Sequence, residues 1–257
     1  MVDHSAARGT AASDERTKTG KPSHTSRGLM SPRNWVYGLA IGVTLAIVAF
    51  NIIRPIIVLP RIAPAPGYSL LGADGQRVTS EDQRGKLTLY SFSYLDCTDA
   101  CPQSLDDIAR VRQAVGEALP ADTPLTFVTI SLDPARDTTA RLAEMPPEAR
   151  GQSATDPAWL LLTGDPMRTR YTVGGGFGVY YSEPKEPTDG SPGRVTFDPR
   201  YVLVDGLGIM RAEYRTGTPD PDLIARDVNL LVEEAANSEG IARLGYEAAH
   251  LFLCYPR

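Results

Sequence analysis

The feature that most constrains this chain is a pair of cysteines placed between two runs of different periodicity. Cys97 and Cys101 are separated by three residues and followed by Pro102. Residues 87–94 alternate as in a β-strand, whereas apolar side chains after the pair recur at helical spacing. These apolar positions are Leu105, Ile108, Val111, Val115 and Leu119. The pattern predicts that the pair lies where a strand ends and a helix begins, with Pro102 in the first helical turn.

The start of a helix favours a thiolate over a thiol, because unpaired backbone N–H groups and the positive end of the helix dipole lie beside the sulfur. A thiolate is both a nucleophile and a ligand for soft metal ions. The pair therefore permits a structural disulfide, a reversible redox disulfide or a Cu(I) site. The strand-to-helix setting favours a functional pair. The third cysteine, Cys254, is distant in sequence, and the sequence assigns no function to it.

Composition limits the partners of this chain. Its 257 residues are enough for one sizeable domain with appendages, and its formal net charge is -5. Residues 1–34 hold six Lys/Arg and three Asp/Glu, a balance of +3 that leaves -8 for the rest. An acidic body argues against a nucleic-acid partner. The histidines, His4, His24 and His250, all lie outside the expected folded domain, so a metal site there would lack nearby imidazole.

The N-terminal region reads as a tail followed by an apolar segment. Residues 1–34 are predicted to be a disordered cytoplasmic tail, because they contain few large apolar side chains. Trp35–Ile53 carry no charge, which predicts a single transmembrane anchor over 35–54. Basic residues before it predict an inner (cytoplasmic) membrane protein whose C-terminal part faces the periplasm or cell exterior. A cleaved signal peptide is the less favoured alternative.

The rest of the chain follows an α/β order. We predict a linker at 55–65, a domain at 66–237 and a C-terminal extension at 238–257. After a short hairpin near 68–76, the predicted strands are 87–94, 126–132, 159–162, 201–204 and 210–214. The predicted helices are 102–119, 138–145, 166–173, 221–236 and 241–253. This order is typical of a layered α/β fold with its site at the carboxyl end of a strand.

Four segments resemble one known family. They are Phe92-Ser93-Tyr94 leading into the cysteine pair, Asp133-Pro134-Ala135-Arg136-Asp137-Thr138, Leu162-Thr163-Gly164 and Gly178-Val179-Tyr180-Tyr181-Ser182. Together with the apolar N-terminal segment they resemble the Sco/SenC copper chaperones of cytochrome c oxidase assembly. The resemblance implies a thioredoxin-like fold behind one membrane span, copper bound as Cu(I) by Cys97 and Cys101, and the copper-binding subunit of a respiratory oxidase as partner. Asp133, Arg136 and Asp137 are interpreted as closing a loop and capping a helix.

One position departs from the family pattern. The family supplies a third copper ligand, a histidine eight residues before the Asp that closes the late strand. Counting back from Asp205, this chain has Phe197 there, and a phenyl ring cannot coordinate copper. Two residues later, Pro199 has the offset of the cis-proline that faces the redox cysteines in TlpA-type oxidoreductases. An ordinary turn proline is the alternative.

Two classes of function follow from these residues. As a binding module, the domain would hold Cu(I) on Cys97 and Cys101 and pass it to the oxidase. As an enzyme, it would be a thiol-disulfide oxidoreductase in which Cys97 attacks, Cys101 resolves and Pro199 faces the pair. The alternative is a general TlpA-like oxidoreductase not tied to copper. A peroxidase is less favoured, because Tyr94 stands where peroxiredoxins keep Thr or Ser.

Overall fold

The computed structural model describes residues 32–53, 57–98, 101–145, 158–182, 184, 193–238 and 240–252. The chain divides into two compact units, residues 1–49 and 50–257. The predictions for residues 1–31 and for Cys254 fall outside the described residues.

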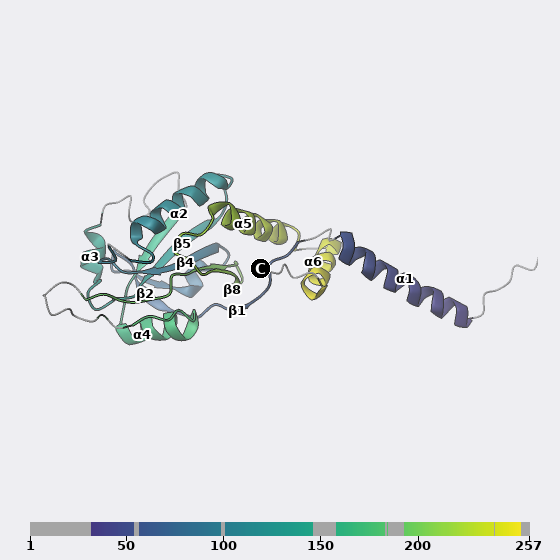
Figure 1. Ribbon diagram of the computed structural model, residues 1–257, viewed down its shortest axis with the longest axis horizontal. Helices are drawn as coiled ribbons and strands as arrows, with labels where there is room; N and C mark the ends of the chain where they lie inside the picture. The colour runs from purple at the N-terminus through teal and green to yellow at the C-terminus, as the bar shows by residue number, and fades with distance from the viewer. Residues whose placement is uncertain are drawn as a thin grey trace, which may run out of the picture. The chain divides into compact units, whose positions relative to one another are not determined.

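A mixed sheet forms the centre of the second unit (Figure 1). It has six strands, in the order β1-β8-β7-β4-β5-β6. Its strands are β1 (Ala63–Pro64), β4 (Leu87–Ser93), β5 (Leu125–Ser131), β6 (Ala158–Leu162), β7 (Tyr201–Val204) and β8 (Ile209–Tyr214). β4, β5 and β6 run parallel, whereas β7 lies antiparallel to β4 and to β8. The parallel strands β4 and β5 are buried along their whole length, as both faces of the sheet are covered.

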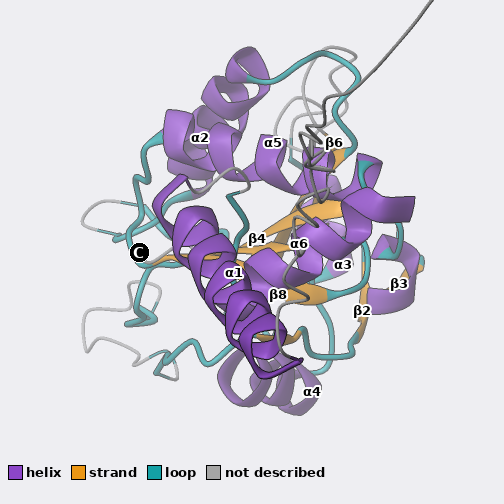
Figure 2. Ribbon diagram, turned by 90° about the vertical axis from the view of Figure 1, so that its right-hand side faces the viewer, coloured by secondary structure: helices purple, strands orange, loops and turns teal. Residues whose placement is uncertain are grey.

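Helices cover both faces of this sheet (Figure 2). α2 (Leu105–Ala118) and α5 (Pro221–Ala236) pack over one face, where Leu89 and Phe127 join a single apolar cluster. The other face carries α4 (Pro166–Arg170), the π-helical turn η3 (Tyr171–Gly176) and the hairpin of β2 (Ser69–Leu71) and β3 (Arg77–Thr79), which leads into the 3-10 turn η1 (Ser80–Gln83). Because successive side chains of a strand point to opposite faces of the sheet, the strands contribute to two apolar cores, one on each face.

Several predicted elements form at other boundaries. The helix after the cysteines begins at Leu105 with Ser104 as its N-cap, so the prediction that Pro102 lies in its first turn is wrong. The helix predicted at 166–173 continues as a π-helical turn through Gly176. Part of the predicted linker belongs to the domain, because β1 pairs with β8 and Leu59 is fully buried.

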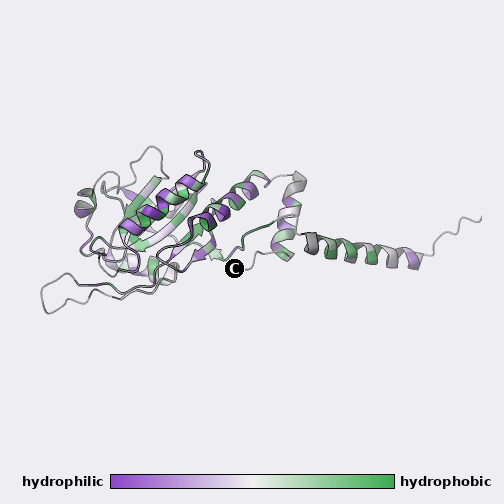
Figure 3. Ribbon diagram, turned by 45° about the horizontal axis from the view of Figure 1, so that its top comes forward, coloured by the Kyte–Doolittle hydropathy of each residue, from purple (hydrophilic) through white to green (hydrophobic). Residues whose placement is uncertain are grey.

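Helix α1 (Pro32–Ile53) begins three residues before the predicted anchor. The described side chains along it are exposed. Most of its residues are hydrophobic, as the green ribbon in Figure 3 indicates. Within the described ranges, no helix is both long enough and apolar enough to cross a membrane. The predicted transmembrane anchor is therefore not confirmed.

The predicted C-terminal helix is present as α6 (Gly240–Phe252). It contacts a group of charged side chains around Arg211, which pairs with Asp205 at 2.9 Å and with Glu234 at 2.7 Å. From α6, the His250 ring lies 2.9 Å from the same Glu234 carboxylate. This group ties α6 to the end of α5 and to β8.

Candidate redox and metal site

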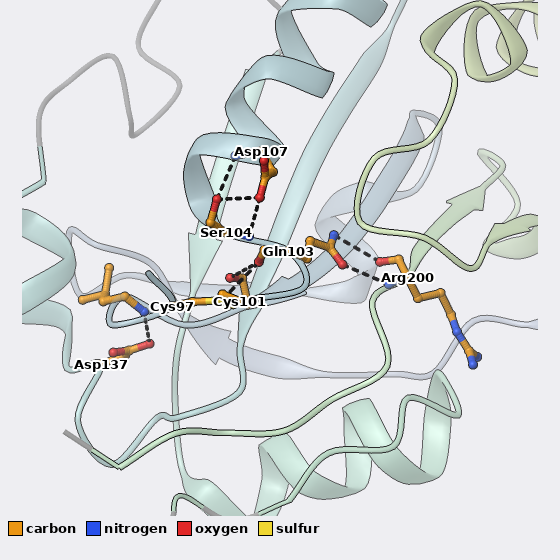
Figure 4. The surroundings of a disulfide bond; sticks show 9 residues. Cys97, Cys101, Gln103, Ser104, Asp107, Asp137 and Arg200 are labelled. Carbon is orange, nitrogen blue, oxygen red and sulfur yellow. Dashed lines mark hydrogen bonds between the residues drawn. A yellow bond between two sulfur atoms is a disulfide. The ribbon is translucent and has the colours of Figure 1, made fainter. Parts of the chain in front are cut away.

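The structure joins Cys97 and Cys101 in a disulfide (Figure 4). Their Cα atoms are 5.4 Å apart, within the range that a disulfide spans. Only 4% of Cys97 is exposed, whereas Cys101 is half-buried. A client or a metal donor therefore reaches the sulfur of Cys101 more easily than that of Cys97.

The pair lies in a loop of consecutive turns between β4 and α2. Cys97 N–H donates to the carbonyl of Tyr94 at 3.1 Å, and Cys101 N–H donates to that of Thr98 at 2.9 Å. The N-terminus of α2 is already capped, because the hydroxyl of Ser104 accepts from Asp107 N–H and the Asp107 carboxylate accepts from Ser104 N–H. The helix start is thus occupied by its own residues, and the predicted stabilisation of a thiolate by free N–H groups is weakened.

Two carboxylates anchor the first half of this loop to α3 (Thr139–Ala143) and the residues before it. Asp137 accepts the N–H of Leu95 at 3.0 Å and the hydroxyl of Ser131 at 2.6 Å. Burial raises the pKa of Asp137 above its ordinary value. Asp96 forms two hydrogen bonds with the guanidinium of Arg141, and these bonds lower the pKa of Asp96.

The segment 133–138 acts structurally, as the sequence predicts. Arg136 forms an ion pair with Asp133 and also donates to the carbonyl of Gly193. Thr138 caps α3 by accepting from Arg141 N–H. Of the three polar residues in question, Asp137 contacts the cysteine loop through the backbone of Leu95. These contacts agree with the predicted loop closure, whereas Thr138, and none of the three, caps the helix.

Phe197 occupies the position expected for a metal-binding imidazole. It is buried, forms an isolated β-bridge with Tyr181 and contacts Tyr94 edge to face, with ring centroids 6.4 Å apart. Phe197 and Cys97 belong to the same apolar cluster. The position expected for a histidine therefore lies in the apolar cluster that contains Cys97, and its side chain is apolar.

Pro199 follows Phe197 in a segment that is fixed to the cysteine loop. The next residue, Arg200, exchanges two hydrogen bonds with the side-chain amide of Gln103: its N–H donates at 2.9 Å and its carbonyl accepts at 3.4 Å (Figure 4). Pro199 is half-buried beside this contact. The prediction that Pro199 itself faces the disulfide stays a prediction.

Both cysteines open into a surface depression of about 550 Å³. Its other lining residues are Leu95, Thr98, Ser104, Leu105, Asp106, Asp107, Arg110 and Met145. Across the residues the structure describes, no group of three or more His, Cys, Asp or Glu side chains could hold a metal ion. The two cysteine sulfurs are soft donors, which suit Cu(I) better than Cu(II); Met145 lines the same depression.

Sequence reasoning missed four residues of this site. Ser104 and Asp107 have the spacing of a capping box, a signal that places the helix start two residues after Pro102. Met145 carries no signal in the sequence, because its position at the depression depends on the packing of α3. Gln103 carries none either, since its partner Arg200 is 97 residues away.

Comparison with known proteins agrees with this geometry. The SCO1/SenC family model matches residues 61–233. The mitochondrial SCO1 homolog 1 of Arabidopsis thaliana is 33% identical over 119 residues, which cover 46% of this chain and 33% of that protein. The chain thus spans about a third of the length of this relative.

Solved structures give the same answer over a larger share of the chain. Arabidopsis thaliana ScoI with copper bound is 26% identical, covers 66% of this chain and 99% of that one, and superposes with a TM-score of 0.53. Bradyrhizobium japonicum ScoI with copper bound is 28% identical with the same coverages and a TM-score of 0.51. The fold is the mixed α/β, thioredoxin-like fold of these proteins. Because the family match extends over more than half of its residues, the chain belongs to the SCO1/SenC family.

Proposed function

We propose that this protein assists assembly of the copper centre of cytochrome c oxidase through the Cys97–Cys101 pair, as a thiol-disulfide reductant and as a Cu(I) carrier. The observation that carries the proposal is a disulfide-forming C-x-x-x-C pair, one sulfur of which is accessible, in the Sco fold. The two solved relatives described above hold copper. The partner would be the copper-binding subunit of the oxidase.

The redox step is a two-electron exchange. The reduced pair attacks a client disulfide through one thiolate and forms a mixed disulfide, and the client releases one thiolate. The second cysteine then displaces the client, so the client leaves as a dithiol while Cys97 and Cys101 become a disulfide. Since Cys101 is the more exposed, we assign the attack to Cys101 and the resolving step to Cys97, the reverse of the order predicted from sequence. A dithiol reductant restores the pair.

The copper step uses the same two sulfurs. Two thiolates satisfy Cu(I), whereas Cu(II) prefers additional nitrogen or oxygen donors in a tetragonal arrangement. Phe197 supplies no donor at the position where an imidazole is expected, so Cu(II) would be bound weakly. Cys97 and Cys101 cannot form a disulfide and bind copper at once, so the two activities exclude each other on one molecule.

The second candidate is a general TlpA-like thiol-disulfide oxidoreductase that acts on clients unrelated to copper. Phe197 favours it, because an apolar side chain beside the pair removes a competitor for the thiols. The position of Pro199, next to the Gln103–Arg200 contact, also favours it. The two candidates differ in their clients and in their need for copper.

An exported location belongs to the proposal. A working disulfide requires an oxidising compartment, and basic residues precede the exposed apolar side chains of α1. Attachment at the outer face of the cytoplasmic membrane through α1 is tested by adding protease to spheroplasts. The domain should be digested and residues 1–31 spared, whereas loss of the N-terminal residues alone would contradict this orientation.

The deciding experiment measures thiols and copper on the purified protein. Treatment with mild reductant should raise the number of free thiols by two. This increase should be absent from Cys97→Ser and Cys101→Ser, and it should remain in the matched control, Cys254→Ser. The reduced protein should bind one Cu(I) per chain and the oxidised protein none. Release of thiols without copper binding would favour the general oxidoreductase. The absence of both thiol release and copper binding would refute both candidates.

A further inference from the structure

The side chain of Gln103 links two segments that the site requires. Gln103 follows Cys101 by two residues and is 0% exposed. Its amide accepts the Arg200 N–H and donates to the Arg200 carbonyl, at 2.9 and 3.4 Å. This double exchange is the pattern by which two residues pair in an antiparallel ladder. The amide therefore holds the segment of Phe197 and Pro199 against the cysteine loop.

The backbone of the same residue lies against the buried cysteine. The carbonyl oxygen of Gln103 accepts the hydroxyl of Ser93 at 2.7 Å and lies 3.4 Å from Sγ of Cys97. A thiol can donate a hydrogen bond to this oxygen, whereas a disulfide sulfur carries no hydrogen. The contact thus favours the reduced pair, provided that the carbonyl stays in place.

The backbone next to this carbonyl is closely packed in the folded domain. Gly217 lies so close to the preceding residue that a Cβ there would overlap the carbonyl oxygen of Pro102. Tyr201 lies at the same place, because its hydroxyl donates to the carbonyl of Gly217. Burial raises the pKa of Tyr201, and a hydrogen bond with Gln103 offsets part of this rise. Gln103 is therefore held between β4, the 197–200 segment and the loop of Gly217.

We infer that Gln103 is a positioning residue for disulfide exchange: its side chain fixes the 197–200 segment while its carbonyl stabilises the reduced Cys97 thiol. The inference rests on the proposed redox function of the pair. It deepens that proposal by naming the residue that joins the oxidation state of Cys97 to the position of Phe197 and Pro199.

The test is the equilibrium of the Cys97–Cys101 pair with reduced and oxidised glutathione at pH 7, without copper or client. Gln103→Met retains an unbranched side chain of similar length but removes both hydrogen bonds to Arg200. Freed from this anchor, the carbonyl moves away from Cys97, and the reduced form loses about one hydrogen bond. The equilibrium should shift about fivefold towards the disulfide, a fall of about 20 mV in reduction potential. Gln113→Met, at an exposed glutamine on α2, is the matched control and should not shift it.

A second variant separates positioning from a general loss of stability. Gln103→Glu keeps the acceptor for Arg200 N–H but places a carboxylate oxygen against the Arg200 carbonyl. When protonated, this group donates like the amide, so the equilibrium relative to wild type should be near normal at pH 5 and displaced towards the disulfide at pH 8. A merely structural role would give no such pH profile.

The outcomes distinguish the inference from the proposed function. If folded Gln103→Met and Gln103→Glu both have the wild-type equilibrium at every pH, the positioning role is overturned although the redox function stands. If glutathione cannot reduce the wild-type pair, the redox proposal itself fails. The glutathione equilibrium is measured without copper. A failure of the protein to bind copper would therefore count against the proposed copper function and not against the role of Gln103.

Discussion

At the scale of single residues, the proposed preference of the site for Cu(I) over Cu(II) depends on Phe197. Its ring packs against Tyr94, and both residues belong to the apolar cluster that contains Cys97. Without a nitrogen donor from Phe197, the donors that this site offers to a metal ion are the two soft sulfurs of the cysteines. Asp137, also beneath the loop, is a second residue with a measurable effect, because its carboxylate is buried and has a raised pKa.

Replacing Phe197 by histidine should add a nitrogen donor and strengthen Cu(II) binding by at least tenfold, while Cu(I) affinity changes little. Titration of the reduced domain with each ion, in competition with a chelator of known affinity, measures both values. Phe177→His, in the same apolar cluster, is the control and should not bind Cu(II) more tightly. Tight Cu(II) binding by the unaltered domain would contradict the proposed role of Phe197.

Asp137 should make stability fall as the pH rises. A carboxyl with a raised folded pKa favours the protonated form, so its contribution is complete below the ordinary pKa of 3.8 and is lost as pH rises through the folded pKa. Asp137→Asn removes this loss and can still accept from Leu95 and Ser131. Relative to wild type, the variant should gain unfolding free energy between pH 4 and pH 7.

Urea unfolding at several pH values measures this difference, with Asp122→Asn at an exposed turn as the control. Comparison with wild type is essential, because other carboxylates act in the opposite direction. Asp96, whose pKa the Arg141 guanidinium lowers, stabilises the fold above its unfolded pKa. An equal pH dependence in Asp137→Asn and wild type would contradict the assignment.

At the scale of elements, the site lies where loops from different strands meet. The cysteine loop follows β4, the Phe197 segment precedes β7, and the loop of Gly217 follows β8. β7 and β4 are neighbours in the sheet, which places their loops side by side. The loop after β8 lies so close to the cysteine loop that a side chain at Gly217 would overlap the backbone of Pro102. Packing between these loops therefore fixes the position of the cysteine loop.

Gly217→Ala should destabilise the domain by about 1–3 kcal/mol, because the added methyl group would overlap the carbonyl of Pro102 and force backbone to move. Gly175→Ala is the matched control, since its Cβ would meet no atom within 4 Å. Urea unfolding of the oxidised proteins measures the difference. Equal stability of the two variants would show that the Pro102 loop yields easily.

For the domain as a whole, residues 58–64 are tied to the folded domain and do not form a free linker. Val58 and Leu59 are fully buried, and β1 forms an edge of the six-stranded sheet. Arg211, only 3% exposed, donates to the carbonyl of Leu59 at 2.8 Å and also to that of Pro60. The same arginine pairs with buried Asp205 and half-buried Glu234, so this segment supports the charged group that holds α6.

A chain that starts at Ile57 should therefore be folded, whereas one that starts at Gly67 should be less stable by on the order of 5 kcal/mol. The shorter chain loses two buried side chains at roughly 1.5–3 kcal/mol each and two carbonyl acceptors of Arg211. Such a loss approaches the whole stability of many domains. Circular dichroism during urea unfolding compares them, and equal midpoints would restore the interpretation of this segment as a linker.

The sequence alone determined the order of the elements and the place of the cysteine pair. Apolar periodicity is local, so it predicted β4, β5, the β7–β8 hairpin and α5 near their observed bounds. The spacing of Cys97, Cys101 and Pro102, with the segment 133–138, was enough to indicate the family that the family model then matched. Capping chemistry, also local, was the signal overlooked at Ser104.

Only the tertiary structure decided how distant segments meet around that pair. The exposure of Cys101 relative to Cys97, the packing of Phe197 on Tyr94 and the burial of Leu59 under Arg211 all depend on contacts between residues far apart in sequence. Gln103 is the clearest case, since nothing near it in the chain indicates that its amide pairs with Arg200. Local patterns specify strands, helices and turns, whereas the partners of a buried polar group are chosen by the packing of the whole domain.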